Sequence, residues 1–498
     1  MRPILCMLCA ALALAAACSP GQPPPAATPP RPTPPPTSPA AVPPSPFPAR
    51  SAQPPAGTPA PAPSAQSPVE TPPLAPPGEA AEIVLLHGAV LTMEDDPARA
   101  EALAVRDGKI LAVGTDAEIA RLIGAETHVI DLTGRALLPG FVDAHTHVFY
   151  FAGGDDDLAP AQDELLSSGI TAIGEAGATP ALLARLQALD RQGALRVRAS
   201  LYLLATNNCG RLEGDWYRAY PPARPAGGML HIPGIKIFED GGACNEPALS
   251  VGGGDGTQAS GDLYFPAAEL GQMIAAAQQD GYQVAVHAVG DRAVETALGA
   301  IAAALDGGPN VYRHRIEHNH VVRPEIMPRF GETGTLPVLS GKYPACAAAE
   351  PVTPPAYRAW EWPYRALVDA NPGLPFAWHS DYPVFGSFDP VAHLYGMVTR
   401  KEISADGRIC TPPDWALDDR LQAGEALRAM TLGGAYALLR DDEIGSLRPG
   451  KYADLVVLSA DPLGMAPDGL GDLEVLLTMV AGRIEYCAPG HGGSLSIP

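Results

Sequence analysis

Residues 137–147 read LLPGFVDAHTH, an apolar run that ends in two histidines one residue apart. The run 141–145 has the length and composition of a buried β-strand. Side chains two positions apart near a strand end point to the same side, so His145 and His147 can converge on one metal ion. An HxH pair alone is weak evidence, because most such pairs are surface or core histidines. Its meaning depends on what the rest of the chain places beside it.

Short apolar runs alternate with Ala- and Leu-rich helical stretches between residues 141 and 390. This alternation is typical of parallel βαβ units. Eight strands with interposed helices predict a closed (β/α)₈ barrel of the TIM type. The expected strands are 141–145, 170–173, 196–201, 235–238, 283–287, 314–318, 336–339 and 375–378.

Polar side chains stand at the ends of several of these strands. His287 closes the fifth strand, His318 closes the sixth, and Asp381 follows the eighth. Because the ends of barrel strands meet around one opening, we expect these residues to become neighbours of the HxH pair. The sequence therefore predicts a metal site at the mouth of the barrel.

Lys236 lies inside the apolar fourth strand, where a buried ammonium is costly unless it is paired or chemically changed. In one interpretation, Glu239 or Asp240 neutralises it. In the other, it condenses with carbon dioxide to a carbamate, an anion that can bridge two metal ions. The residues alone leave both interpretations open.

The two ends of the folded region are rich in short β-like runs broken by Gly and Asp. We expect them to form one β-sandwich beside the barrel. The predicted domains are a signal peptide at 1–17, a Pro/Ala-rich disordered stalk at 18–80, the sandwich at 81–138 and 440–498, and the barrel at 139–439.

The amino terminus predicts export. A basic start, an apolar run from Ile4 to Ala17 and a cysteine at position 18 resemble the signal and lipobox of bacterial lipoproteins, in which Cys18 would carry the lipid. Ordinary secretion with cleavage near Ala17 is the alternative. The first interpretation predicts a membrane-anchored lipoprotein that faces the periplasm or the cell surface, and the second a periplasmic or secreted protein.

Composition limits the partners. The net charge of −22 excludes a protein built to neutralise phosphates, so no nucleic-acid partner is expected. After Cys18, the remaining cysteines have wide, irregular spacing with no CxxC pair, so we expect neither a disulfide framework nor a structural zinc site. One disulfide bridge is possible, but the sequence does not indicate which cysteines would form it. These cysteines are Cys209, Cys244, Cys346, Cys410 and Cys487.

Several separated motifs together resemble one family. LLPGFVDAHTH resembles the opening metal motif of the amidohydrolase superfamily, and the tail IGSLRPGKYADLVVL at 444–458 resembles its closing β-sandwich signature. Four further motifs look like the YtcJ-like (amidohydrolase 3) branch, which includes N-substituted formamide deformylases. They are IKIFEDG at 235–241, HAVGDR at 287–292, RIEH at 315–318 and SDYPV at 380–384.

The resemblance implies a barrel with a flanking sandwich that holds one or two divalent ions, most often zinc. Asp381 would be the catalytic residue, a general base that then returns its proton as an acid. Arg292 and Asp240 are weak candidates for substrate binding, although a salt bridge at a helix start also explains Arg292 and its neighbour. The implied metal ligands are His145, His147, Lys236 as carbamate, His287, His318 and Asp381.

The predicted function is metal-dependent hydrolysis of a non-peptide C–N bond, in an N-acyl or N-formyl amine or a cyclic amide, by water that the metal activates. The same centre could instead act on an ester or lactone or as a deaminase, or the protein could be a catalytically inactive metal-binding surface lipoprotein. The partner is a small molecule, and the oligomeric state stays open. His314, His320 and His379 flank the motifs and receive no role.

One departure from the branch concerns the loop after the first metal motif. The long insertion common there is replaced by about twenty residues before the second expected strand. We therefore expect either a more open pocket or one walled by other segments, such as 207–224 or 252–263.

Overall fold

The computed structural model describes residues 80–95, 98–154, 157–252, 260–347 and 351–490. The predicted signal peptide, Cys18 and all but the last residue of the predicted stalk lie outside these ranges. Within the described ranges, no helix is both long and apolar enough to cross a membrane.

The central element is a sheet of eight strands, in which each strand pairs in parallel with the next along the chain. Most of its residues are buried and apolar, as expected for strands covered on both faces. The strands are β8 (Phe141–Thr146), β9 (Ile170–Ala178), β10 (Arg198–Leu204), β11 (Leu230–Phe238), β12 (Gln283–Ala288), β13 (Arg315–His318), β14 (Leu336–Ser340) and β15 (Ala377–His379).

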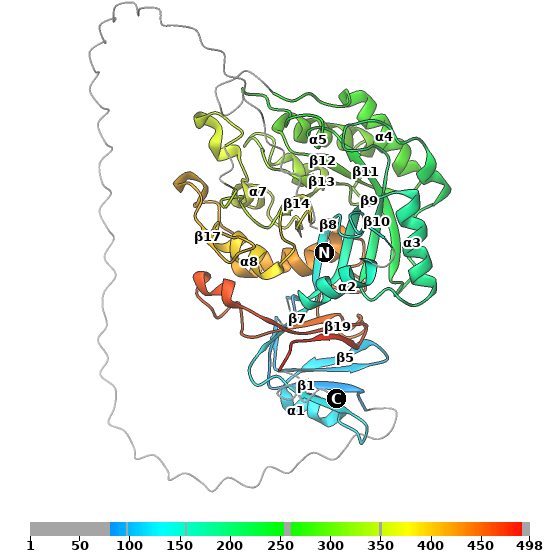
Figure 1. Ribbon diagram of the computed structural model, residues 1–498, viewed down its shortest axis with the longest axis vertical. Coiled ribbons are helices and arrows are strands. Elements are labelled where there is room, and N and C mark those ends of the chain that lie inside the picture. Colours follow the sequence, from blue (N-terminus) through cyan, green and yellow to red (C-terminus); the bar gives the residue numbers. More distant parts are fainter. Residues whose placement is uncertain (1–79, 96–97, 155–156, 253–259, 348–350, 491–498) are drawn as a thin grey trace, which may run out of the picture. The chain divides into compact units, whose positions relative to one another are not determined.

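Helices follow most of these strands and cover the outside of the sheet, as Figure 1 shows for α3, α4 and α5 beside β9 to β12. Residues at their amino ends determine where these helices begin. In α3, the Thr179 side chain accepts a hydrogen bond from the Leu182 amide, and Pro180 occupies the first turn. The helices are α2 (Leu158–Ser167), α3 (Pro180–Arg191), α4 (Ala267–Gln279), α5 (Asp291–Leu305), α6 (Arg329–Thr333), α7 (Tyr364–Ala370), α8 (Pro390–Thr399), α9 (Ala423–Arg428) and α10 (Gly434–Ala437).

The first and last strands of the barrel meet through side-chain and loop contacts. Asp143 on β8 accepts hydrogen bonds from the amide of Ser380 at 3.0 Å and from its hydroxyl. The Asp381 amide donates to the His145 carbonyl at 3.0 Å. These contacts bring the end of the eighth strand beside the first metal motif, and the predicted barrel is confirmed.

The sandwich is built from both ends of the folded region, as predicted. Its sheets have the orders β5-β4-β1-β6 and β20-β19-β18-β7-β2-β3. Figure 1 shows blue and red strands together there, and β18 from the carboxyl end pairs with β7 from the amino end. Its strands are β1 (Ile83–Leu86), β2 (Ala89–Leu91), β3 (Arg99–Ala100), β4 (Ala102–Arg106), β5 (Lys109–Gly114), β6 (His128–Asp131), β7 (Ala136–Pro139), β18 (Leu455–Leu458), β19 (Val475–Val480) and β20 (Arg483–Cys487).

A buried ion pair joins barrel and sandwich. The guanidinium of Arg198, at the start of β10, donates to both carboxylate oxygens of Asp454 at 2.7 and 3.1 Å. Asp454 immediately precedes β18, and it also accepts a hydrogen bond from the Ala481 amide. Outside these layers lie the short helix α1 (Asp116–Ile119) and the hairpin of β16 (Glu402–Ile403) and β17 (Ile409–Cys410).

The cysteine prediction needs correction. Two disulfides form, Cys209–Cys244 and Cys346–Cys410, and Cys487 alone among the cysteines of the described residues stays free. The bridged residues are 35 and 64 positions apart in sequence, yet each pair of Cα atoms lies 5.1 Å apart. Folded loops create this proximity, and irregular spacing along the chain does not reveal it.

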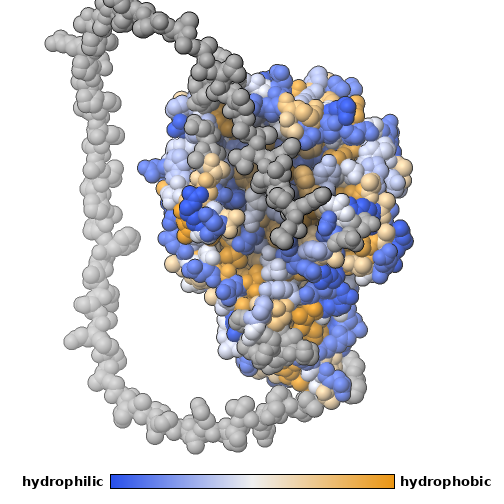
Figure 2. All heavy atoms as spheres, viewed as in Figure 1, coloured by the Kyte–Doolittle hydropathy of each residue, from blue (hydrophilic) through white to orange (hydrophobic). Residues whose placement is uncertain are grey.

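On the face shown in Figure 2, the surface is mostly hydrophilic at its edge, with hydrophobic residues in smaller groups. Scattered apolar residues are normal on protein surfaces, so only a cluster of exposed apolar residues beside a cavity needs a functional explanation.

Candidate metal centre

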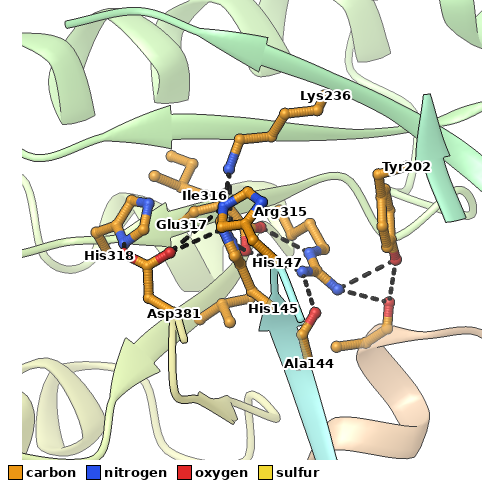
Figure 3. A network of polar contacts seen from close by, with 12 residues as sticks. Ala144, His145, His147, Tyr202, Lys236, Arg315, Ile316, Glu317, His318 and Asp381 are labelled. Carbon is orange, nitrogen blue, oxygen red and sulfur yellow. Dashed lines mark hydrogen bonds and ion pairs between the residues drawn. The ribbon is translucent and has the colours of Figure 1, made fainter. Parts of the chain in front are cut away.

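All six residues that the sequence proposed as ligands lie at the carboxyl ends of the barrel strands or project inward near them. His145 lies in β8 and His147 directly follows it, and Lys236 comes from β11. His287 and His318 stand at the ends of β12 and β13, and Asp381 lies two residues beyond β15. Figure 3 shows Lys236, His147, His318 and Asp381 around His145. Ligand atoms of His145, His318 and Asp381 lie within 4.8 Å of one another.

A buried network orients His145. Its Nδ1 lies 2.6 Å from Glu317 Oε2, and Arg315 donates to both oxygens of Glu317 at 2.6 and 2.9 Å (Figure 3). Although burial opposes it, the charge of Arg315 holds the pKa of Glu317 below its ordinary value. The carboxylate therefore accepts a hydrogen bond from the Nδ1–H of His145, which leaves the lone pair on Nε2 facing the other ligands.

Asp381 faces both histidines of the HxH pair. Its Oδ1 lies 3.5 Å from His145 Nε2 and 3.4 Å from His147 Nε2, and its Oδ2 lies 3.9 Å from His318 Nδ1. The backbone of both His318 and Asp381 has positive φ, 76° and 55°. Non-glycine residues rarely adopt this region, and such strain gathers at functional sites.

Glu175 on β9 supports the loop that carries His147. It accepts hydrogen bonds from the amides of Phe149 at 2.9 Å and Tyr150 at 3.2 Å, and its Oε1 lies 3.8 Å from His147 Nδ1. Burial raises the pKa of Glu175 to about 7. This carboxyl group fixes the loop after the first strand and faces the far nitrogen of His147.

The buried histidines present the form that binds metals. Burial, and to a smaller extent the charge of Lys236, holds the pKa values of His145 and His287 well below the ordinary value for histidine. Burial and the neighbouring His287 lower the pKa of His318 in the same way. The Nε2 atoms of His287 and His318 are buried and have no hydrogen-bond partner among the described residues. Neutral rings with free nitrogens are suitable ligands for a divalent ion, so the residues present fit the implied metal.

Lys236 is fully buried beside this set. Its Nζ lies 3.4 Å from both ring nitrogens of His145. Burial lowers the pKa of Lys236 to about 8. Glu317 and Asp381 supply the nearby negative charge. The pairing with Glu239 or Asp240 that the sequence left open is not among its contacts.

Asp240 and Arg292 lie outside the cavity lining. Asp240 accepts hydrogen bonds from three backbone amides, those of Ala248, Val289 and Gly290, at 2.8 to 2.9 Å. Arg292 stands in the first turn of α5, where its amide donates to the Ala248 carbonyl. The expected salt bridge at this helix start is made by the neighbouring Asp291, which pairs with Arg323 at 3.2 Å.

Of the three histidines without a predicted role, the structure brings His379 into the centre. Its ring centroid lies 4.9 Å from that of His318 and 5.3 Å from that of His145, and both of its nitrogens are buried without partners. The eighth strand runs to His379, one residue beyond its predicted end, so the side chain shares a face with Ala377. His314 instead bonds Gln278 and the Val284 amide.

A cavity of about 280 Å³ opens beside the centre. It is lined by His147, His287, His318 and Asp381 together with apolar and amide side chains. Asn207 and Asn208 form part of the wall, in agreement with the expected role of 207–224. Among the described residues, none from 252–263 contributes to the lining.

Comparisons with known proteins show which family this chain resembles. The sequence model of the amidohydrolase family matches residues 154–486. An imidazolonepropionase of Symbiobacterium thermophilum is 27% identical over 447 residues, which cover 80% of this chain and 95% of that protein. An N-substituted formamide deformylase of Arthrobacter pascens is 25% identical over 344 residues, 66% of this chain and 59% of that protein. YtcJ of Bacillus subtilis, an amidohydrolase, is 27% identical over 275 residues, 52% of this chain and 48% of that protein.

Solved structures share the fold. A metal-dependent hydrolase of Pyrococcus horikoshii superposes with a TM-score of 0.65 at 19% identity, covering 78% of this chain and 99% of that one. An adenosine deaminase of Xanthomonas campestris with bound zinc superposes with a TM-score of 0.58 at 20% identity, covering 84% and 97%.

Proposed function

This chain belongs to the amidohydrolase family, a family of metal-dependent hydrolases, and on that premise we propose that it hydrolyses a non-peptide C–N bond of a small molecule. The family match and two of the relatives confirm the YtcJ-like resemblance carried by the motifs. The proposed substrates are N-acyl or N-formyl amines and cyclic amides. The observation that carries the proposal is the convergence of neutral imidazoles with free nitrogens on Asp381.

The proposed ligands fall into two groups. His145 and His147 would hold an ion from the end of β8 and His318 from the end of β13, since all three face Asp381. His287 would join them from β12, where its ring centroid lies 4.4 Å from that of His318. Zinc suits a set of imidazole and carboxylate ligands. A divalent ion held there would polarise a carbonyl group and lower the pKa of a water molecule.

The carboxylate of Asp381 is the proposed proton carrier. Its side chain is 13% exposed and lines the cavity, so substrate and water can reach it. It would take the proton of the attacking water and return it to the leaving nitrogen, a role that contributes about 10²- to 10⁴-fold to a rate. The hydrogen bond from its own amide to the His145 carbonyl holds it beside the first metal motif.

Lys236 is the proposed bridging ligand in carbamate form. Its lowered pKa, about 8, makes a neutral amine accessible near neutral pH, and only the neutral amine can attack carbon dioxide. The new N–C bond forms as one proton leaves, and the resulting anion is better suited than an ammonium group to a site that must bind cations. Bicarbonate in the buffer is expected to raise metal retention, whereas a Lys236→Gln variant should not respond.

Export is proposed together with this function. The apolar amino terminus that ends at Cys18 supports it, and so do the two disulfides, because disulfides persist in oxidising compartments. Lipidation at Cys18 would tether the enzyme to a membrane. Mass spectrometry of the purified mature protein would identify a lipid-modified Cys18 or a free amino terminus near it.

The test of the function is hydrolysis of a panel of N-acyl amines, N-formyl amines, cyclic amides, esters and lactones by the metal-loaded protein. Asp381→Asn should lose at least about 100-fold in rate. Asp468→Asn is the matched control, because Asp468 is exposed and its one ion pair within the described part of the chain is with Lys401. Turnover of esters alone would replace the C–N assignment, and metal without turnover of any class would favour a binding protein.

A further inference from the structure

The cavity beside the metal centre is lined mostly by apolar and amide side chains. Among the described residues of its lining there is no lysine or arginine, and Asp381 is the sole carboxylate; the other polar members near the centre are His147, His287 and His318. The remaining walls combine apolar side chains with two amides. The apolar ones are Tyr150, Phe151, Leu204, Phe238, Ala243 and Val384.

Two aromatic rings at the mouth are exposed although they are apolar. Tyr150 is 45% and Phe151 56% exposed, and their ring centroids lie 5.1 Å apart. Both rings stand edge-on to His147, at 6.3 and 6.4 Å. Val384, 63% exposed, lines the same cavity. Covering such exposed apolar groups with a ligand removes apolar surface from water and so favours binding.

The backbone holds this aromatic pair in place. The Tyr150 amide donates to Glu175, and the Phe151 amide donates to the His147 carbonyl at 3.0 Å. At Gly177, a Cβ atom would lie 2.9 Å from His147 Nδ1 and 3.1 Å from the Tyr150 ring, so only glycine leaves room for both. The rings therefore form a wall that exists before any substrate binds.

A second part of the cavity wall is also preformed. Cys209 and Cys244 join the loop that follows β10 to the loop that follows β11, and the Ala243 amide donates to the Asn208 carbonyl at 3.2 Å. The Asn207 side-chain oxygen already accepts from two backbone amides of its own loop. This wall offers polar groups without charge, and the volume between the walls lies near the lower end of the roughly 300–1,000 Å³ of small-molecule sites.

We propose that the enzyme selects a neutral substrate with one ring-sized apolar substituent, which packs against Tyr150 and Phe151 while the scissile bond faces Asp381. This inference rests on the proposed function for the reaction, but the selectivity concerns binding. A carboxylate on the substituent would lose its hydration inside the cavity and find no cationic side chain among the described lining residues, which disfavours its binding.

Three N-formyl amines separate size from charge. N-formyl-phenethylamine carries the ring, N-formyl-phenylalanine carries the same ring and a carboxylate, and N-formyl-methylamine carries neither. We expect kcat/KM for the first to exceed that of each of the others at least tenfold. Dissociation constants measured by calorimetry on metal-loaded Asp381→Asn should follow the same order without relying on turnover.

Variants locate the effect. Phe151→Ala should raise KM for the phenethyl compound about tenfold with kcat nearly unchanged, because it removes binding shared by ground state and transition state. Phe151→Leu should recover part of the loss. Val311→Ala is the matched control, because Val311 is 69% exposed and does not line the cavity.

The outcomes distinguish the two proposals. Hydrolysis with no preference between the neutral and the charged ring compound, or a Phe151→Ala variant with unchanged binding, overturns the selectivity and leaves the C–N hydrolase standing. Preferential binding of the neutral ring compound without hydrolysis of any amide supports the selectivity and overturns the proposed reaction. No binding and no hydrolysis overturns both.

Discussion

Replacing Glu317 by glutamine is expected to weaken metal binding and lower stability together. The substitution preserves shape but removes the negative charge that the Nδ1 of His145 and the guanidinium of Arg315 share. All three side chains are fully buried. With a single neutral amide oxygen in place of the carboxylate, the His145 proton is held less firmly on Nδ1, so the Nε2 lone pair is less strictly reserved for the metal.

The magnitude follows from two separate effects. Loss of a partner that orients a ligating histidine typically costs 10- to 100-fold in metal affinity. Leaving the buried Arg315 without its counter-charge costs about 3–5 kcal/mol of unfolding free energy, and the retained amide oxygen places the cost near the lower end. Arg315 keeps its hydrogen bonds to the Tyr202 hydroxyl and the Ala144 carbonyl.

Competition with a chromogenic chelator measures the first effect, and urea unfolding of the metal-free protein measures the second. Glu325→Gln is the matched control, because Glu325 is 64% exposed in its pair with Arg323 and should change stability by less than about 1 kcal/mol. The double variant Arg315→Met/Glu317→Gln should regain much of the stability and still bind metal weakly. Wild-type metal affinity in Glu317→Gln would refute the orienting role of this network.

Three further outcomes are expected. Burial raises the pKa of Glu239 to about 9 in the folded protein, against an ordinary 4.5, so this residue lowers the unfolding free energy increasingly as pH rises from about 4.5 to 9. In urea unfolding, Glu239→Gln should therefore stabilise the protein by about 1–3 kcal/mol at pH 8 and have little effect at pH 4. Cys209→Ser/Cys244→Ser should raise KM several-fold in steady-state assays, because the disulfide joins two loops of the cavity wall, and an unchanged KM would mean that the hydrogen bonds suffice. Arg198→Met should lower stability by about 3–5 kcal/mol, because it leaves the buried Asp454 unpaired, and calorimetry that finds no loss would contradict the role of this pair in joining barrel and sandwich.

Sequence periodicity predicted the barrel because its strands are buried on both faces and therefore read as continuous apolar runs. The same reading predicted where the ends of β8, β12 and β13 would meet, since all strands of a parallel barrel end on one side. The polar residues among those apolar runs stood out for the same reason. Lys236 and His318 are examples, and the structure brings both to the centre.

Partners that are distant in sequence were not predictable. Arg315 and Glu317 are two positions apart and so share one face of β13, which suggests two polar residues that point inward. The histidine that Glu317 orients lies 172 residues away in sequence, so the partner could not be read from β13 itself. Glu175 sits in an apolar strand and received no role, although an inward carboxyl among buried residues was the available signal. His379 received no role from the sequence, because nothing in its spacing ties it to the metal centre; the structure extends the eighth strand to this residue.

Loops carried the least information. β7 and β18 of the sandwich pair across more than 300 residues. Short β-like runs at both ends of the folded region predicted one sandwich, although not this pairing. Disulfide partners and cavity walls depend instead on how irregular segments fold back, and no periodicity encodes that. The predicted signal peptide, stalk and lipid anchor rest on composition, and they stay predictions.

The most direct test of the central claim is the metal content of the purified protein, measured by elemental analysis for wild type and for His287→Ala/His318→Ala. The free nitrogens of these two rings lie in a centre built to hold a divalent ion. We expect one to two equivalents of a zinc-like metal in wild type and a clear loss in the double variant, with the fold retained by circular dichroism. A correctly folded wild-type protein that cannot be loaded with metal would contradict the site assignment and the proposed function with it.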